Sequence, residues 1–134
     1  MSSGNGNEKR PVVLVLADVE EIRDAIKKLL CADGYSVQSA REEEDAVMSA
    51  RRQSPNLLLV SLGGDGDRVI ATARRVRQRA ELSDNVTIVI FCSPTIAEGA
   101  EVDIGGSVYV MRPDNFDQLR RLLKQLLRRL VVIR

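Results

Sequence analysis

The stretch VVLVLADVEEIRDAIKKLLCADGYSV, residues 12–37, decides the fold of this chain. Residues 12–16 are apolar without a break, which is typical of a strand that is buried on both faces of a parallel sheet. Isoleucine and leucine then recur at helical spacing among charged residues, and this helix is expected to end at Asp33-Gly34, since glycine favours a helix terminus. A second short strand is expected over residues 35–39.

The same alternation of strand and helix continues to the end of the chain. Strands are expected over residues 57–60, 86–91 and 108–111, and helices around residues 46–50, 69–76 and 116–130, with a weaker and shorter helical stretch over residues 95–103. Strands and helices that alternate at this spacing favour a parallel sheet with right-handed crossovers. We therefore predict an α/β fold, a doubly wound five-stranded parallel sheet with helices on both faces.

The length and charge of the chain limit what it can be. Its 134 residues suit one domain, which we place at residues 11–134 after a disordered leader over residues 1–10. Lys and Arg total 20 and Asp and Glu total 19, so the overall charge predicts no nucleic-acid partner. The chain has no apolar run of the roughly 18 residues that span a membrane. We expect a cytoplasmic protein without a membrane partner.

The residue types that are missing exclude several kinds of active site. The chain contains no histidine, so Ser-His and Cys-His nucleophiles and histidine-ligated metals are excluded. Its two cysteines, Cys31 and Cys92, are too few for a thiolate metal site, and we expect both to be reduced and buried. The sequence predicts no enzyme activity, no cofactor and no metal ion.

In a doubly wound sheet the ligand crevice lies beyond the carboxyl ends of the strands. The candidate functional residues are therefore sought where the predicted strands end. These positions are Ala17-Asp18, residues 61–66, residues 92–95 and Arg112-Pro113.

Four segments resemble the receiver domain of two-component response regulators. They are VLADVEEIRDAIKKLLCADGYSV, SPNLLLVSL, TIVIFCSP and VYVMRP, and the resemblance extends from residue 12 to about residue 130. It implies a flavodoxin-like (βα)5 fold and a role in two-component (phosphorelay) signal transduction. It also implies that the residues after the strands form a phosphorylation site.

That implied site is degenerate, as in a pseudo-receiver. The two adjacent acidic residues of the family fall on Ala17 and Asp18, and the phosphoacceptor aspartate falls on Ser61. The phosphoryl-binding Thr or Ser falls on Cys92, and the lysine falls on Arg112. A serine cannot form an acyl phosphate, and one carboxylate is a poor magnesium cage. We expect a module that is not phosphorylated and that works by protein–protein interaction.

The resemblance also implies an interaction surface. In the family, partners and dimers often use the face that here comprises residues 95–103, 108–111 and 116–130, and Tyr109 falls on the switch aromatic of that face. The apolar stripe of the last helix spans about 140°, with Leu122 at its edge and Arg121 beside it. We expect a protein partner or a weak homodimer there, with Tyr109, Leu122 and Arg121 as interface candidates.

Other interpretations of single residues stay open. Asp18 is expected to form an ion pair with Arg112 rather than to bind a metal. Ser61 is open to a Ser/Thr kinase and Cys92 to redox sensing, although a polar filler and an inert thiol are the simpler interpretations. The loop GGDG at residues 63–66 has features of a phosphate-binding loop but lacks the Lys-Ser/Thr ending, so a plain connection is favoured.

Two other functions remain as alternatives. One is an α/β domain that binds a small ligand in the strand-end crevice. The other is a nucleic-acid adaptor that uses the basic C-terminal helix, because residues 114–134 include six basic and two acidic residues. The apolar end at residues 130–133 leaves open whether the chain continues into another domain.

Overall fold

The computed structural model describes residues 10–91 and 96–132, the last four of these as backbone only. Strands and helices alternate through most of this length, as the apolar periodicity predicts. The elements are β2 (Val12–Ala17), α1 (Glu20–Ala32), β3 (Ser36–Ala40), α2 (Glu43–Arg52), β4 (Leu57–Ser61), α3 (Gly66–Arg79), β5 (Thr87–Phe91), β6 (Glu101–Gly105), β7 (Val108–Met111) and α4 (Phe116–Val132).

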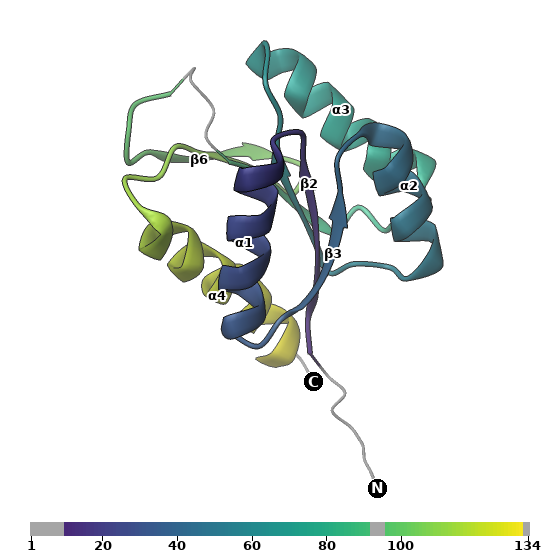
Figure 1. Cartoon of the computed structure of the whole chain (residues 1–134), viewed down its shortest axis with the longest axis horizontal. Coiled ribbons are helices and arrows are strands. Elements are labelled where there is room, and N and C mark those ends of the chain that lie inside the picture. The colour runs from purple at the N-terminus through teal and green to yellow at the C-terminus, as the bar shows by residue number, and fades with distance from the viewer. Residues whose placement is uncertain (1–9, 92–95, 133–134) are drawn as a thin grey trace, which may run out of the picture.

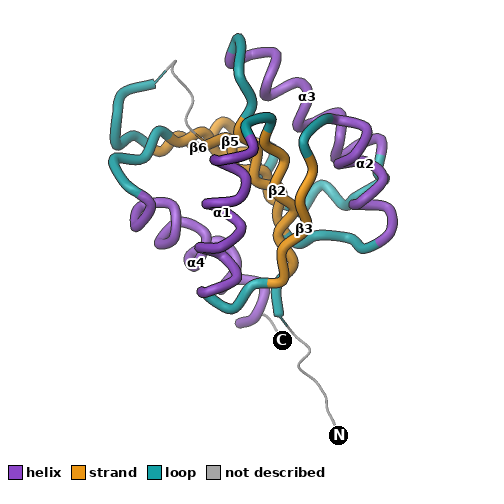
Figure 2. The backbone as a smooth tube through the Cα atoms, viewed as in Figure 1, coloured by secondary structure: helices purple, strands orange, loops and turns teal. Residues whose placement is uncertain are grey.

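The strands form one six-stranded sheet in the order β3-β2-β4-β5-β7-β6. Five strands are parallel, and β6 is antiparallel to β7. Figure 1 shows α1 and α4 on one side of the sheet and α2 and α3 on the other, and Figure 2 shows the same layers as a backbone tube. The doubly wound α/β prediction is confirmed, but the sheet has six strands instead of the five expected, because the antiparallel strand β6 is added at the edge beside β7.

Alternate residues of the central strands point to opposite sides of the sheet and build two cores. Val13 and Val15 pack with α1 and α4, whereas Leu14 and Leu16 pack with α2 and α3. All five residues of β4 are buried, because helices cover this central strand on both faces. The unbroken apolar runs that predicted buried strands are explained by these two cores.

The helix expected over residues 95–103 is not formed, and this prediction is wrong. Residues 96–100 are not helical, and residues 101–105 form β6, which pairs with β7. The sequence EVDIG alternates polar and β-branched residues, which is the period of a strand, and glycines at 99, 105 and 106 disfavour a helix. The leader expected over residues 1–10 lies outside the described residues, apart from Arg10.

The apolar stripe of α4 is covered by both the sheet and α1. Leu122 belongs to the same core as Ile26 and Leu30 of α1 and is only 5% exposed, so its expected place at an exposed edge is wrong. At the margin of the stripe, Arg120 donates two hydrogen bonds to the carboxylate of Asp33, at 2.6 and 2.8 Å. Two covering surfaces explain why the stripe is wide.

Cys31 corrects a further expectation, because it is a free cysteine on the exposed side of α1. It follows Leu30, whose side chain points into the core. Neighbouring residues of a helix point about 100° apart, so the residue after a core position readily faces solvent. None of the helices within residues 10–91 and 96–132 is long and apolar enough to cross a membrane.

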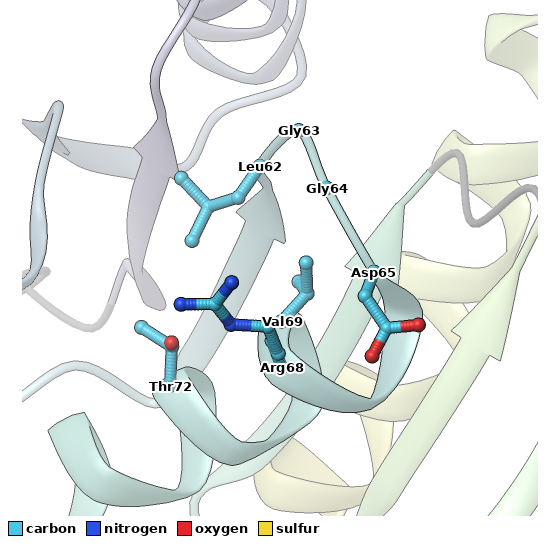
Figure 3. Close-up of a pocket in the computed structure, with 7 residues that line it drawn as sticks. All are labelled: Leu62, Gly63, Gly64, Asp65, Arg68, Val69 and Thr72. Atoms are coloured by element: carbon cyan, nitrogen blue, oxygen red, sulfur yellow. The ribbon is translucent and has the colours of Figure 1, made fainter.

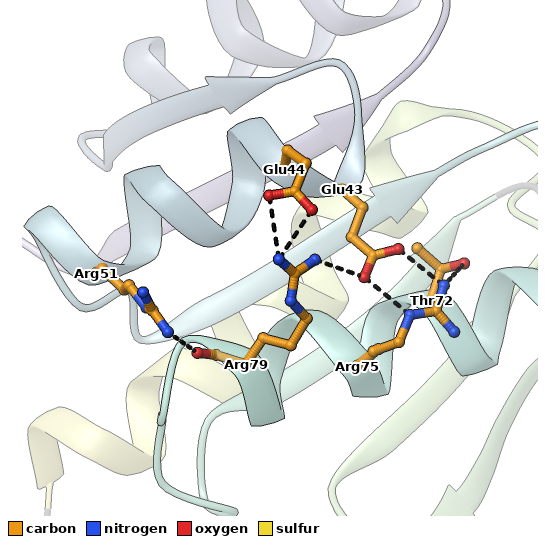
Figure 4. Close-up of polar contacts among 6 residues, drawn as sticks. All are labelled: Glu43, Glu44, Arg51, Thr72, Arg75 and Arg79. Carbon is orange, nitrogen blue, oxygen red and sulfur yellow. Dashed lines mark hydrogen bonds and ion pairs between the residues drawn. The ribbon is translucent and has the colours of Figure 1, made fainter.

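Ion pairs join α2 to α3, on the side of the sheet that faces away from α1 and α4 (Figure 4). Arg75 makes two hydrogen bonds to the Glu43 carboxylate, both 2.8 Å long, and Arg79 approaches the same carboxylate at 3.0 Å. Arg79 also pairs with Glu44 at 2.8 Å. Arg51 donates a hydrogen bond to the backbone carbonyl of Arg79, at 2.8 Å. Glu43 is therefore the shared acceptor of this network.

We expect Glu43→Gln to lower the free energy of unfolding by about 1–2 kcal/mol at neutral pH, because the carboxylate is only partly exposed and is held by two cations. The hydrogen bonds from Arg75, with help from Arg79, lower the pKa of Glu43 from 4.5 to about 2. A lowered folded-state pKa stabilises the fold above the ordinary pKa, and this stabilisation disappears as the pH falls through 4.5 toward about 2.

Urea denaturation at several pH values measures this contribution. Glu44→Gln is the matched control, because Glu44 pairs with Arg79 alone and is mostly exposed, and it should cost less than about 0.5 kcal/mol. Equal losses for the two variants at neutral pH would contradict the central role of Glu43.

Candidate functional site

The ends of β2 and β4 place Ala17 beside Ser61. The two residues are partners in the parallel register, and the backbone N–H of Asp18 lies 3.4 Å from the carbonyl oxygen of Ser61. Ala17 is fully buried and Ser61 is 8% exposed. The sequence therefore predicted correctly that these positions meet at the carboxyl edge of the sheet, which is where doubly wound folds bind ligands.

Asp18 is held by the loop that follows β4. Its Oδ2 atom accepts a hydrogen bond from the backbone N–H of Gly63, at 3.1 Å. A Cβ at Gly63 would lie 3.6 Å from the same oxygen, which is an ordinary van der Waals contact, so this hydrogen bond does not require glycine at position 63. No sequence signal marks this partner, because any residue except proline supplies an N–H.

The expected ion pair between Asp18 and Arg112 is absent from the described residues, and this prediction is wrong. Arg112 follows β7 and donates a hydrogen bond from Nη1 to the carbonyl of Ile96, at 3.2 Å. Two strands, β4 and β5, lie between β2 and β7. Neighbouring strands are about 4.8 Å apart, so the two backbones are roughly 14 Å apart across the sheet. The Gly63 N–H is a nearer partner for Asp18.

The described residues do not fit a magnesium ion. Magnesium prefers oxygen ligands in near-octahedral geometry, with carboxylates as its usual protein ligands. Here Asp18 is the carboxylate next to the Ala17–Ser61 pair, and within residues 10–91 and 96–132 no three acidic or cysteine residues are placed so that they could hold a metal ion together. The arrangement can hold a hydrogen-bonded carboxylate and a buried hydroxyl.

A shallow pocket lies beside the glycine-rich loop, with a volume of about 280 Å³ (Figure 3). Asp65 and Arg68 bring one charge of each sign to its lining, and Thr72 adds a hydroxyl from the second turn of α3. The full lining comprises Leu62, Gly63, Gly64, Asp65, Arg68, Val69 and Thr72. Sequence reasoning had singled out the loop but not Arg68 and Thr72, which follow it at helical spacing.

The other candidate residues fall at three different places. Cys92 lies outside the described residues, as does Ser93 after it. Tyr109 is partly buried on β7, where it packs against the core that faces α1 and α4. Arg121 is exposed on α4. Only Ala17, Asp18 and Ser61 are therefore brought together by the described part of the chain.

No family model matches the sequence, but known proteins with a similar sequence or a similar fold are found. The transcriptional regulatory protein AfsQ1 of Streptomyces coelicolor is 26% identical over 125 residues, which cover 89% of this chain and 52% of that protein. The chain thus spans about half the length of this curated relative.

Solved structures of receiver-type proteins share the fold. The chemotaxis protein CheY4 of Vibrio cholerae has a TM-score of 0.69 at 19% identity, over 87% of this chain and 98% of that chain. The response regulator TrrA of Thermotoga maritima, solved with Mg²⁺ and BeF, has a TM-score of 0.64 at 23% identity, over 87% and 98% of the two chains. The anti-anti-sigma factor PhyR of Bartonella quintana has a TM-score of 0.67 at 21% identity, over 90% and 49%. The chain therefore has the CheY-like fold.

Proposed function

We propose that this chain is a receiver-like module of two-component signal transduction that is not phosphorylated and that works in the cytoplasm by binding a protein partner. The CheY-like fold and the similarity to a transcriptional regulatory protein support the signalling role. The observation that carries the proposal is the pairing of Ala17 with Ser61 at the carboxyl edge of the sheet.

The chemistry of that pair argues against phosphoryl transfer. An acyl phosphate needs a carboxylate acceptor, and Ser61 carries a hydroxyl at that position instead. A divalent cation would have to offset the charge of the phosphoryl group, and Asp18 alone is a poor ligand set for it. A module of this fold without that chemistry still has surfaces for binding another protein.

The partner surface differs from the one that the sequence suggests. Leu122 is buried and is removed from the interface candidates. Tyr109 and Arg121 remain, and β6 takes the place of the expected helix in this face. Any partner on this side therefore meets a strand edge and the exposed residues of α4.

We expect acetyl phosphate with Mg²⁺ to leave the mass of the chain unchanged, because the acceptor and most metal ligands are missing. Intact-mass spectrometry measures the result, and a second sample with beryllofluoride is followed by NMR amide shifts. Ser61→Ala is the matched control, since it removes the hydroxyl at the acceptor position. A mass increase of one phosphoryl group that Ser61→Ala abolishes would refute the proposal.

A further inference from the structure

Strand β6 forms an outer edge of the sheet. It pairs with β7 on one side, and no strand among residues 10–91 and 96–132 pairs with its other side. All five of its residues are exposed. An edge strand of this kind presents unpaired backbone groups that another extended segment can use.

The register indicates which backbone groups are free. Arg112 donates its N–H to the carbonyl of Ala100 across the ladder, at 3.0 Å. In antiparallel pairs, residues that exchange hydrogen bonds alternate with residues that do not. Val102 therefore pairs inward with Val110, and the N–H and C=O groups of Glu101 and Asp103 point outward. These four groups are spaced so that a neighbouring strand could form hydrogen bonds with them.

The side chains of β6 differ between its two faces. Val102 lies opposite Val110, on the side of α2 and α3. The side chains of Val102 and Ile104 are each 39% exposed. Glu101 lies on the side of α4, where its Oε2 accepts a hydrogen bond from Gln118 at 2.9 Å, and Asp103 lies opposite Tyr109 on the same side. A neighbouring strand would thus meet apolar side chains on one face and carboxylates on the other.

The surroundings of β6 are acidic in a chain whose overall charge is +1. Residues 98–117 include five acidic residues and one basic residue, Arg112. All five acidic residues are exposed, and they are Glu98, Glu101, Asp103, Asp114 and Asp117. Charge complementarity therefore favours a basic partner.

A second copy of this chain is a poor partner for the edge. Antiparallel pairing of two β6 strands centred on Val102 would place Glu101 of each copy opposite Asp103 of the other. Like charges in directly opposed positions destabilise a strand pair. The carboxylates thus oppose self-association and select a different segment.

We propose that the open edge of β6 binds an extended basic segment of a partner protein, which adds a seventh strand to the sheet. Its lysine or arginine side chains face Glu101 and Asp103, and its apolar side chains cover Val102 and Ile104. This inference rests on the partner-binding role proposed above and names its surface. The edge is separate from the Ala17–Ser61 pair, so the two are testable independently.

The probe is a short peptide of alternating lysine and valine, titrated into the isotope-labelled chain. We expect the largest amide shifts on β6 and β7, and saturable binding in calorimetry. The same peptide N-methylated at alternate residues along the edge that would face β6 keeps its charge but loses those N–H donors, and should bind at least tenfold more weakly. A peptide with glutamate in place of lysine should show no binding.

Two variants of the chain test the charge. Glu101→Lys should weaken the lysine–valine peptide at least tenfold, whereas Asp24→Lys makes the same charge change on an exposed position of α1 and should leave binding unchanged. The spectra of the free variants report that each remains folded. Equal binding of the N-methylated peptide, shifts confined to α4, or no binding at all would overturn the proposal.

Sedimentation of the free chain completes the test. A monomer supports the proposal, whereas a dimer that Glu101→Lys strengthens, because the new lysine would lie opposite Asp103 of the other copy, would overturn it in favour of self-pairing. Phosphoryl uptake at Ser61 would refute the proposed function and leave the peptide result unchanged. Failure of the peptide would refute this surface alone.

Discussion

Leu122→Glu is expected to destabilise the domain by about 4 kcal/mol or more, which is a large part of the roughly 5–15 kcal/mol that holds a domain folded. Leu122 is 5% exposed in the core between α4, α1 and the sheet. The substitution removes apolar contacts and buries a carboxylate for which that apolar core supplies no partner. Guanidinium or thermal denaturation, followed by far-UV circular dichroism, measures the loss.

Arg121→Glu is the matched control for this variant. Arg121 precedes Leu122 on α4 but is exposed, so the same new side chain should change the free energy of unfolding by less than about 1 kcal/mol. Equal stability of the two variants would show that the face of α4 that packs against the core is not the one that carries Leu122. In a partner-binding experiment, loss of binding by Leu122→Glu would therefore report unfolding, whereas loss of binding by Arg121→Glu would report a surface contact.

The double variant Ala17→Asp with Ser61→Asp is expected to bind Mg²⁺ at millimolar concentration, whereas the natural chain is expected to bind none. The register sets the two new carboxylates on adjacent strand ends, next to Asp18. Three carboxylates at one edge supply the hard oxygen ligands that magnesium prefers. Calorimetric titration with Mg²⁺ measures the gain.

Stability gives a second measure of this site. Both positions are buried, so two new carboxylates should repel each other and lower the melting temperature in the absence of metal. Mg²⁺ should then restore it by mass action, because the ion binds the folded state alone. Ser61→Asp by itself is the control, with a smaller recovery. A double variant whose melting temperature ignores millimolar Mg²⁺ would contradict the alignment of β2 with β4.

The elements that the sequence predicted well are those with strong periodicity and clear ends. The strand expected at residues 108–111 is found with the same bounds, and α1 ends at Ala32, just before Asp33-Gly34. Gly34 has a φ of 96°, which explains why glycine marks that end. The meeting of Ala17 with Ser61 follows from parallel strands of matched length. The local sequence pattern was therefore enough to predict the layers of the fold and the meeting of Ala17 with Ser61.

The predictions that failed depend on contacts between distant parts of the chain. The Asp18–Arg112 pair does not form because the backbone N–H of Gly63 is closer to Asp18 than a side chain that follows a strand three positions away in the sheet. Leu122 was placed at an edge because a helical wheel shows one helix and not the α1 surface beside it. The stretch 101–105 has a period-two pattern that sequence alone supports, but the order of helices and strands elsewhere favoured a helix there.

The β6–β7 hairpin also bears on the order in which the sheet assembles. Only Gly106 and Ser107 separate the two strands, and their φ angles of 64° and 62° suit a tight turn that matches the twist of the strands. Each parallel pair of the sheet instead joins strands with longer connections, so closing it costs more chain entropy and takes longer. We therefore expect the part of the sheet that stays open in the folded protein to form first, so that β7 is already paired along one side when the parallel strands come together.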